Sequence, residues 1–399
     1  MVQLLRGINM KKTIKDFDLS GKKVIIRCDL NVPMKDNEID DDTRILASVR
    51  TIKYALAGGA SVILLSHLGK VKTEEDKLTN SLYPVSKSLS LYLNKEVLFS
   101  YDTRSDNLTK MAGELKRGEV LLIENTRFED LEGKKESNCD EDLAKYWASL
   151  GDIFINDAYG SSHRSHASVT GIPKFLPSGV GFLVEKEIKK IDGVLASDSH
   201  PFIVVMGGKK VDDKITLIER LLEKCDKLLI GGAMSFTFLK TMGYNTGKSI
   251  VSDEHLEFCK KMLDKYSDKI VLPIDYVLED TIKIIEEFED NDIGYDIGPK
   301  TVRLFEEELV LAKRVIINGP MGMFEDSRYA SGTKKILKIL DKNKIKTVVG
   351  GGDTASAVNK LGFGDSFYHV STGGGATMKY LEDSTLVGIE VIDNGKEEN

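Results

Sequence analysis

The 399-residue sequence has only four cysteines, Cys28, Cys139, Cys225 and Cys259, and they lie far apart. Structural zinc sites use closely spaced cysteine pairs, and small secreted domains carry a dense set of disulfides. Neither pattern is present. The cysteine content therefore excludes both classes and favours free thiols in a reducing, cytoplasmic environment.

Long apolar runs are also missing, and none approaches the roughly 20 residues that a membrane-spanning helix needs. The first residues, M-V-Q-L-L-R-G-I-N-M-K-K, contain too short an apolar segment for an export signal. Met10 is an alternative start, which would make residues 1–9 an upstream extension. We expect a protein without a membrane anchor.

Positive charge is not in excess, because the formal net charge is −7. This balance argues against a nucleic-acid-binding surface. Residues 1–184 carry 26 basic and 26 acidic residues, which leaves 30 basic and 37 acidic residues for the rest. An anion site in the first half must therefore be a local basic cluster. The chain has more residues than one hydrophobic core ordinarily organises, and its length therefore predicts two domains.

Glycine-rich corners are the main feature that the sequence does contain. Residues 348–358, V-V-G-G-G-D-T-A-S-A-V, read as a strand end, a turn and a helix start. Glycines allow close approach of the backbone to a ligand, and a helix N-terminus favours phosphate. Asp353 is placed to hold a magnesium ion on that phosphate. The alternative is a glycine-rich turn with Asp353 as the helix N-cap.

The same design recurs three times in the second half of the chain. Glycines follow apolar strands in M-G-G-K-K-V-D-D-K at 206–214, in G-G-A at 231–233 and in T-G-G-G at 372–375. Four such corners fit one edge of a parallel sheet, the carboxyl edge at which open α/β sheets bind ligands. The pattern predicts an α/β fold with a nucleotide-phosphate site.

In the first half, the residues that follow successive apolar strands are mostly basic. They are Arg44, His67, Lys70, Arg127 and Arg164. Each alone is typical of a solvated surface charge. Together, at equivalent places in a strand–helix array, they predict a site for a small polyanion.

The boundaries of the predicted domains follow from these two arrays. We expect an N-terminal domain over residues 1–180 and a C-terminal nucleotide-binding domain over 200–399. Residues 181–199 contain the amphipathic helix Val184–Leu195, which is a candidate hinge. The extreme C-terminus is expected to pack on the N-terminal domain.

Two motifs point elsewhere and are set aside. G-Y-N-T-G-K-S at 243–249 nearly spells a P-loop but has one residue too few between its glycines. Gly350-x-Gly352-x-x-Ala355 matches a loose dinucleotide fingerprint, which keeps an NAD-dependent dehydrogenase as a weak alternative. That alternative needs an acidic residue about twenty positions on, where this chain has glycines.

From about Lys12 to its C-terminus, the chain resembles the phosphoglycerate kinase family. The matching stretches are R-C-D-L-N-V-P, D-D-T-R-I, S-H-L-G, E-N-T-R-F, N-D-A-Y-G-S-S-H-R-S-H-A-S, N-G-P-M-G-M-F-E, G-G-G-D-T and S-T-G-G-G-A. The resemblance implies two Rossmann-like three-layer αβα domains with mostly parallel sheets, joined by a hinge helix. It also implies reversible phosphoryl transfer from 1,3-bisphosphoglycerate to ADP, giving 3-phosphoglycerate and ATP, in a closed two-domain cleft.

The resemblance also assigns roles to residues. It implies that phosphoglycerate is held by Asp29, Leu30, Asn31, Arg44, His67, Leu68, Gly69, Lys70, Arg127 and Arg164. For the nucleotide it implies Lys210, Lys214, Gly232, Gly294, Asn318, Pro320, Glu325, Gly351, Gly352, Asp353 and Thr354, with Asp353 binding Mg²⁺. The catalytic set would be Arg44, Lys210, Gly373, Gly374 and Gly375.

The chain departs from the family pattern at four positions. Lys70 replaces an arginine and so lacks the planar fork for bidentate phosphate contact. Lys209 replaces a small residue beside the nucleotide, and we expect its side chain to point outward. Ile317 replaces a tryptophan and Tyr159 a phenylalanine. None of these changes removes a charge that the chemistry needs.

The implied reaction explains why the sequence has no Ser-His-Asp set and no carboxylate dyad. The acceptor oxygen is already ionised at neutral pH, so no general base is required. A non-catalytic nucleotide-binding relative is the other alternative, but it would be favoured by loss of Arg44, Lys210 or Asp353. We expect a cytoplasmic monomer that binds small molecules and neither nucleic acid nor membrane.

Overall fold

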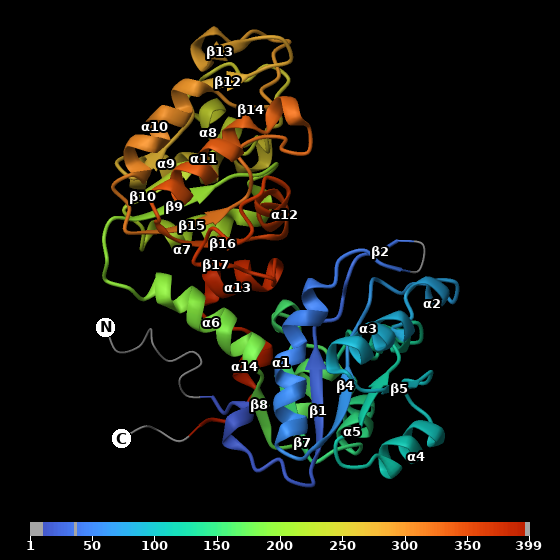
Figure 1. The fold of residues 1–399 in the computed structure, drawn as a ribbon. Coiled ribbons are helices and arrows are strands. Elements are labelled where there is room, and N and C mark those ends of the chain that lie inside the picture. The colour runs from blue at the N-terminus through green and yellow to red at the C-terminus, as the bar shows by residue number, and fades with distance from the viewer. Residues whose placement is uncertain (1–10, 36–37, 396–399) are drawn as a thin grey trace. The chain divides into compact units, whose positions relative to one another are not determined.

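The computed structural model describes residues 11–35 and 38–395, and its elements are drawn in Figure 1. The alternative start at Met10 lies outside the described residues. The chain forms two compact units, which are Met1–Lys189 with Ser384–Asn399 (unit 1) and Lys190–Asp383 (unit 2). Helix α6 (Phe182–Leu195) contains the boundary. Each unit is built on one parallel sheet.

Unit 1 has a six-stranded sheet in the order β5-β6-β4-β1-β7-β8. All of its pairings are parallel. The strands are β1 (Lys23–Cys28), β4 (Ser61–Leu65), β5 (Val97–Ser100), β6 (Val120–Ile123), β7 (Ile153–Asp157) and β8 (Ser178–Val180). The helices are α1 (Thr43–Ala57), α2 (Asp76–Thr79), α3 (Tyr83–Leu93), α4 (Asp106–Glu114) and α5 (Glu141–Ala148). A two-stranded hairpin, β2 (Met34–Lys35) and β3 (Glu38–Ile39), precedes α1.

Local sequence explains where several of these helices begin and end. Ser105 accepts a hydrogen bond from Leu108 N at 3.0 Å at the start of α4, and Asp140 accepts one from Leu143 N at 2.9 Å at the start of α5. Both are N-caps of the expected chemical type. Helix α3 ends at Asn94, which adopts the left-handed conformation with φ 49°.

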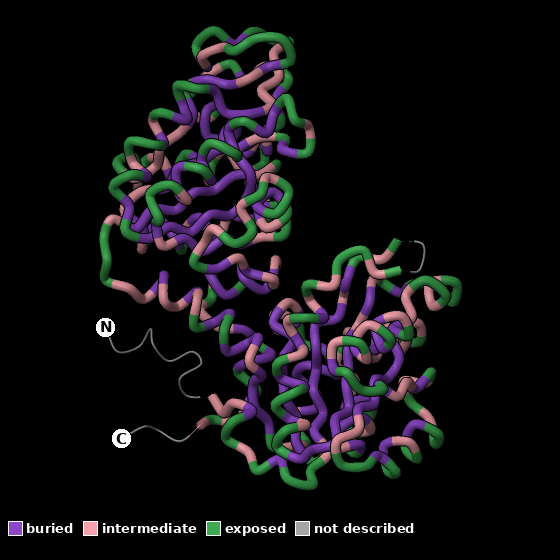
Figure 2. Tube along the Cα trace, in the orientation of Figure 1, coloured by how far each residue is buried: buried purple, intermediate pink, exposed green. Residues whose placement is uncertain are grey.

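The sheet of unit 1 is buried on both faces, as the purple strands in Figure 2 show. One face packs on α1 and α3, through residues such as Val24, Ile52 and Leu89, all 0% exposed. Residues of the opposite face, such as Ile25 and Ile63, are equally buried. Strands covered on both faces read as continuous apolar runs, which is why the sequence predicted them well.

Unit 2 has a second parallel sheet, in the order β11-β10-β9-β15-β16-β17. Its strands are β9 (Phe202–Met206), β10 (Lys227–Ile230), β11 (Ile270–Val271), β15 (Arg314–Asn318), β16 (Lys346–Gly350) and β17 (His369–Val370). Its helices are α7 (Ile215–Leu222), α8 (Ser235–Thr241), α9 (Leu256–Tyr266), α10 (Pro299–Leu309), α11 (Ser331–Lys342), α12 (Gly352–Lys360) and α13 (Gly375–Asp383). The expected α/β architecture with mostly parallel sheets is confirmed.

A small antiparallel sheet in unit 2 was not predicted. It consists of β13 (Ile282–Ile284), β12 (Asp275–Val277) and β14 (Asp296–Ile297). Asp275 also accepts hydrogen bonds from Thr301 N at 2.7 Å and Lys300 N at 2.9 Å, and so fixes the start of α10. Strands this short carry too few residues for an alternation signal.

The C-terminal segment belongs to unit 1 and contains α14 (Val387–Glu390). Asn156 donates to Gly388 O at 2.8 Å, and Lys12 N donates to Asp393 O at 2.9 Å. These bonds hold the last described residues on β7 and on the start of the chain. Among the described helices, none combines the length and apolar character that crossing a membrane requires.

Candidate functional site

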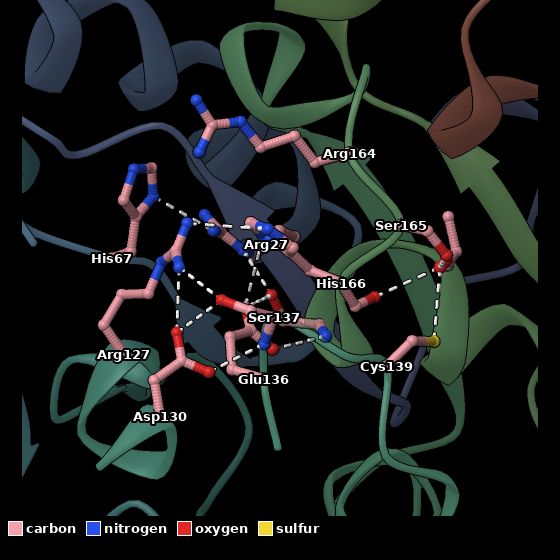
Figure 3. Close-up of polar contacts among 12 residues, drawn as sticks. Arg27, His67, Arg127, Asp130, Glu136, Ser137, Cys139, Arg164, Ser165 and His166 are labelled. Carbon is pink, nitrogen blue, oxygen red and sulfur yellow. Dashed lines mark hydrogen bonds and ion pairs between the residues drawn. The ribbon is translucent and has the colours of Figure 1, made fainter. Parts of the chain in front are cut away.

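The carboxyl edge of the unit 1 sheet gathers a set of basic side chains. In-register pairing of Arg27 with Leu65 and with Asn156 places the ends of β1, β4 and β7 level with one another. The loops that follow therefore meet. We call the result the basic cluster, which consists of Arg27, Arg44, His67, Arg127, Arg164 and His166. Figure 3 labels all of these residues except Arg44.

Arg27 is a member of the basic cluster that the sequence-based site did not include. It lies within β1 and is 0% exposed. Its Nε donates to Ser168 Oγ at 2.8 Å, and its Nη2 lies 3.1 Å from His67 Nδ1 (Figure 3). The one charge inside the apolar run K-V-I-I-R-C was the available signal, because buried charges are rare unless they are paired.

His67 is held by Arg27 in a single tautomer. A guanidinium has no acceptor, so Nδ1 of His67 accepts the hydrogen bond and Nε2 carries the proton. Burial, followed by the charge of Arg27, lowers the pKa of His67 well below its usual value. His67 is thus a neutral N–H donor, which suits it to bind an oxyanion and not to transfer a proton.

Arg127 is oriented by an acidic partner three residues along the chain. Its Nη1 lies 2.8 Å from Asp130 Oδ2, and Asp130 also accepts from Ser137 N at 2.7 Å. On its other side, Nη2 lies 3.5 Å from His166 Nε2. Arg127 Nε has no hydrogen-bond partner among the described residues. The guanidinium is therefore rigidly placed and retains an unused donor.

Glu136 lies beneath the basic cluster and balances part of its charge. It is 0% exposed, and it accepts hydrogen bonds from Ser168 N at 3.0 Å and from Ser168 Oγ at 2.5 Å. Burial raises the pKa of Glu136, whereas the charge of Arg27 lowers it. His166 lies next to this carboxylate, and burial together with Arg127 lowers the pKa of His166 to about 3. His166 is therefore neutral near pH 7.

The predicted residues Asp29 and Asn31 organise the loop after β1. Asp29 forms an ion pair with Arg44 at 3.0 Å, and Asn31 Oδ1 accepts from Gly69 N at 2.8 Å. Leu30 N donates to Ser66 Oγ at 2.9 Å. These bonds connect the loops after β1 and β4, and they leave the amide nitrogen of Asn31 as a donor.

The remaining predicted residues of this site lie around its rim. Leu68 N donates to Asn125 Oδ1 at 3.2 Å, which anchors the loop. Gly69 has φ +60°, and a Cβ there would lie 2.5 Å from Asn80 Oδ1, so only glycine fits. Lys70 and Arg164 are exposed, and Arg164 Nε donates to His163 Nε2 at 3.0 Å. Lys70 and Arg164 are thus accessible to a ligand.

In unit 2, the predicted glycine corners meet at one edge of the sheet. Met206 pairs with both Ile230 and Asn318, and Asn318 pairs with Gly350. The turns after β9, β10, β15 and β16 are therefore level. Gly232, at φ +63°, shows how close they come, because a Cβ there would lie 2.6 Å from Gly208 N.

Beside these corners lies a cavity of about 990 Å³. It is lined by five of the predicted nucleotide residues, which are Gly232, Gly294, Pro320, Glu325 and Asp353. The sequence did not identify its apolar wall, which includes Phe236, Ile250, Tyr276, Ile293 and Met321. A large cavity with an apolar, aromatic wall and a few polar groups is typical of a cofactor or nucleotide site.

Other predicted nucleotide residues lie at the corners and do not line the cavity. Lys210 and Lys214 form ion pairs with Asp212 at 3.5 Å and with Asp213 at 3.1 Å. Thr354 Oγ1 accepts from Gly319 N at 2.6 Å and so joins two corners. Asn318 is 2% exposed, and its Nδ2 has no partner among the described residues. A buried, unused donor is the kind of group that a phosphate oxygen satisfies.

The predicted catalytic glycines form a neighbouring corner. Gly373 and Gly374 precede α13, which begins at Gly375, and α12 begins at Gly352. A Cβ on Gly374 would lie 3.8 Å from Gly352 N. Two helix N-termini therefore present backbone N–H groups side by side, an arrangement that favours an anion. Of the other two members of the catalytic set, Lys210 belongs to unit 2 and Arg44 to unit 1.

Asp353 fits the metal role that the sequence predicted. It is exposed in the first turn of α12, lines the cavity, and has no hydrogen bond or ion pair with another described residue. Mg²⁺ is commonly held by one or two carboxylates together with substrate phosphates and water. Elsewhere among the described residues, Asp212, Glu254 and His255 bring possible metal ligands within 4.8 Å of one another, but Asp212 is already paired with Lys210.

Lys209 replaces a small residue, and the sequence predicted that its side chain points away from the nucleotide. Lys209 is exposed and is among the residues that line the cavity, so the direction of its side chain stays a prediction. The replacement of tryptophan by Ile317 and of phenylalanine by Tyr159 is absorbed by the core, where they are 1% and 0% exposed.

Comparisons with known proteins identify the family of this chain. The phosphoglycerate kinase family model matches residues 14–384. The chain belongs to the phosphoglycerate kinase family. It is 51% identical to a phosphoglycerate kinase of Fusobacterium nucleatum subsp. nucleatum, covering 96% of this chain and 100% of that protein. It is 49% identical to one of Macrococcus caseolyticus, with 96% and 100% covered.

A solved structure extends the agreement to three dimensions. The phosphoglycerate kinase of Coxiella burnetii matches with a TM-score of 0.85 at 34% identity, covering 96% of this chain and 98% of that one. Family membership removes the dehydrogenase alternative, because the glycine fingerprint at residues 350–355 now has another explanation.

The fixed tautomer of His67 leads to a first prediction. Long-range ¹H–¹⁵N spectra should show His67 as a neutral Nε2–H ring from pH 5.5 to 8, because its folded-state pKa lies well below 6.5. His166, with a pKa of about 3, should also not titrate in this range. A titration midpoint between pH 5.5 and 8 for His67 would contradict the assignment.

Proposed function

We propose a division of labour between the two units for the family reaction, the reversible transfer of a phosphoryl group from 1,3-bisphosphoglycerate to ADP. In this proposal unit 1 holds phosphoglycerate and unit 2 holds the nucleotide. The observation that carries it is the chemical contrast between the two sheet edges. One edge has a basic cluster with unused donors, and the other has glycine corners beside an apolar cavity.

The basic cluster suits phosphoglycerate, which carries a carboxylate and a phosphate. Arginine guanidinium groups bind such groups in bidentate fashion, and neutral His67 adds a fixed N–H donor. His166 joins the residues implied by the resemblance, and the fully buried Arg27 holds the ring of His67 in place. Asp130 orients Arg127 by accepting its hydrogen bond, and Glu136 acts on Arg27 through Ser168, which accepts from Arg27 and donates to Glu136.

The cavity of unit 2 suits ADP and ATP. Its aromatic wall, with Phe236 and Tyr276 stacked at 4.4 Å, offers an apolar surface for the base. The glycine corners, Lys210 and Lys214 lie where the phosphates would follow. Asp353 would hold Mg²⁺, and the metal would neutralise phosphate charge during transfer.

The chain's own residues stabilise charge and supply no general base. Phosphoryl transfer develops charge on three equatorial oxygens, and the acceptor oxygen is already ionised. Arg44, Lys210 and the N–H groups of Gly373, Gly374 and Gly375 are the donors that we assign to these oxygens. The non-catalytic alternative is disfavoured because Arg44, Lys210 and Asp353 are all present.

The setting of the protein follows from its reaction. We propose a monomer in the cytoplasm, where glycolytic metabolites are found, with small-molecule substrates only. Cys28, Cys139, Cys225 and Cys259 are all free, which is compatible with a reducing environment.

The substitution Asp353→Ala tests the proposal that unit 2 holds the nucleotide and its Mg²⁺. A coupled assay with 3-phosphoglycerate and magnesium ATP should show normal turnover for the wild type and a loss of at least about a hundredfold for the variant, since the metal ligand is gone. The fold should persist because Asp353 is exposed. Asp365→Ala, also exposed and in unit 2, is the matched control. Near-normal activity of Asp353→Ala at saturating magnesium would contradict the assignment of Asp353 as the metal ligand.

The substitution Lys70→Arg tests the proposal that unit 1 holds phosphoglycerate. If Lys70 contacts the substrate equally in the ground and transition states, the variant should lower KM for 3-phosphoglycerate severalfold and leave kcat nearly unchanged. Lys72→Arg makes the same change two residues away at another exposed lysine. A large change in kcat would show instead that the residue acts in the transition state.

The residues that we assign to phosphoglycerate lie in unit 1, and those that we assign to the nucleotide lie in unit 2. This division implies that the units move during the reaction cycle. In-line transfer needs reacting atoms about 3–3.5 Å apart with water excluded, whereas entry of the substrates needs open sites. We therefore expect the units to close when both substrates bind, with α6 as the hinge. Small-angle scattering should give the smallest radius of gyration for the doubly bound form. An identical radius in the apo, singly bound and doubly bound forms argues against closure.

A further inference from the structure

The nucleotide cavity has one basic residue on its wall. Among the described residues that line it, Lys209 is the only lysine or arginine, whereas Asp296, Glu325, Asp326 and Asp353 are carboxylic acids. The charged side chains that a nucleotide diphosphate or triphosphate meets in this cavity are therefore mostly acidic, although much of the lining is apolar. Lys209 is the exception, and it stands where the resemblance predicts a small residue.

Lys209 also differs from its neighbours in its partners. Lys210 is paired with Asp212 at 3.5 Å, and Lys214 with Asp213 at 3.1 Å. Lys209 is exposed and forms no hydrogen bond or ion pair with another described residue. Its ammonium group is consequently available to a ligand without first breaking an internal ion pair.

The nearby carboxylates have other roles. Asp326 is held by Arg328 at 2.6 Å, and Asp296 accepts from Gly332 N at 2.6 Å in the interior. Glu325 and Asp353 lie on the same wall, but neither is within ion-pair distance of Lys209. No carboxylate of the described residues thus neutralises the ammonium group of Lys209. A bound polyanion would supply the neutralising negative charge.

The position of Lys209 favours the phosphate end of the cavity. It follows Gly208, and a Cβ on Gly208 would lie 3.7 Å from Lys214 Nζ. The same glycine touches the corner at Gly232. Lys209 therefore lies at the corner where glycines and Lys214 gather, whereas Phe236 and Tyr276 belong to the apolar part of the lining.

We propose that Lys209 is an additional phosphate-binding residue, whose ammonium group pairs with the phosphate chain of the nucleotide in this cavity. This proposal rests on the nucleotide site proposed above and extends it. Lys209 contributes to affinity for ADP and ATP through a charge that the family pattern does not supply. Its contribution is greatest when Mg²⁺ is absent, because the metal neutralises part of the same phosphate charge.

The test compares ligands that differ only in phosphate. Isothermal titration calorimetry on the full chain measures the dissociation constants of adenosine, ADP and magnesium ADP. Lys209→Ala and Lys209→Met should weaken ADP binding about threefold to tenfold and leave adenosine binding unchanged, as expected for one partly solvated charge contact. Lys209→Arg should restore ADP affinity. The weakening should shrink at 0.5 M salt.

Lys334→Ala is the matched control, because Lys334 is an exposed lysine of unit 2 that does not line the cavity. It should bind ADP as the wild type does. Unchanged ADP affinity in Lys209→Ala would overturn the proposal. Equal weakening of adenosine and ADP would also overturn it, because the side chain would then contact the nucleoside and not the phosphates.

A parallel assay separates this proposal from the proposed function. If the wild type binds ADP but does not turn over 3-phosphoglycerate with magnesium ATP, the proposed function fails and the binding comparison still decides the role of Lys209. If the wild type turns over normally and Lys209→Ala binds ADP unchanged, only the role of Lys209 fails.

Discussion

The in-register parallel pairing of the strands is the constraint on which the basic cluster of unit 1 and the glycine corners of unit 2 each depend. Because Arg27 pairs with Leu65 and Asn156, and Met206 with Ile230 and Asn318, the strand ends of each sheet are level. Loops that are far apart in the sequence then meet at one edge. A shift of one residue would turn each strand's buried side chains to the opposite face, so the same pairing that builds the core also assembles the site.

Charge balance is the second requirement, and it is met differently in the two units. The basic cluster concentrates guanidinium groups, one of them fully buried at Arg27, and the acids Asp130 and Glu136 lie behind them. A buried cation without such partners would be strongly destabilising. In unit 2 the glycine corners offer an anion mainly backbone N–H groups and helix N-termini. These groups carry no net charge that the protein would have to balance.

Much of this could be predicted from residue patterns, and the failures have physical causes. Apolar strands such as β1 and β16 were clear because they are buried on both faces. Arg27 was missed because it lies inside a strand and not after one. The wall formed by Phe236 and Tyr276 was missed because aromatic residues in short elements read as ordinary core. The place of Lys209 on the cavity lining was not predicted, because a side chain's surroundings are not local.

The sequence by itself determined the α/β class, the glycine corners, the family and most of the residues assigned to the two sites. These are properties of local spacing, such as a strand followed by glycine and Asp353, and local spacing is written in the chain. Only the tertiary structure decided which groups are neutral, paired or available. The tautomer of His67, the buried charge of Glu136 and the unpaired ammonium of Lys209 all depend on neighbours brought together by folding.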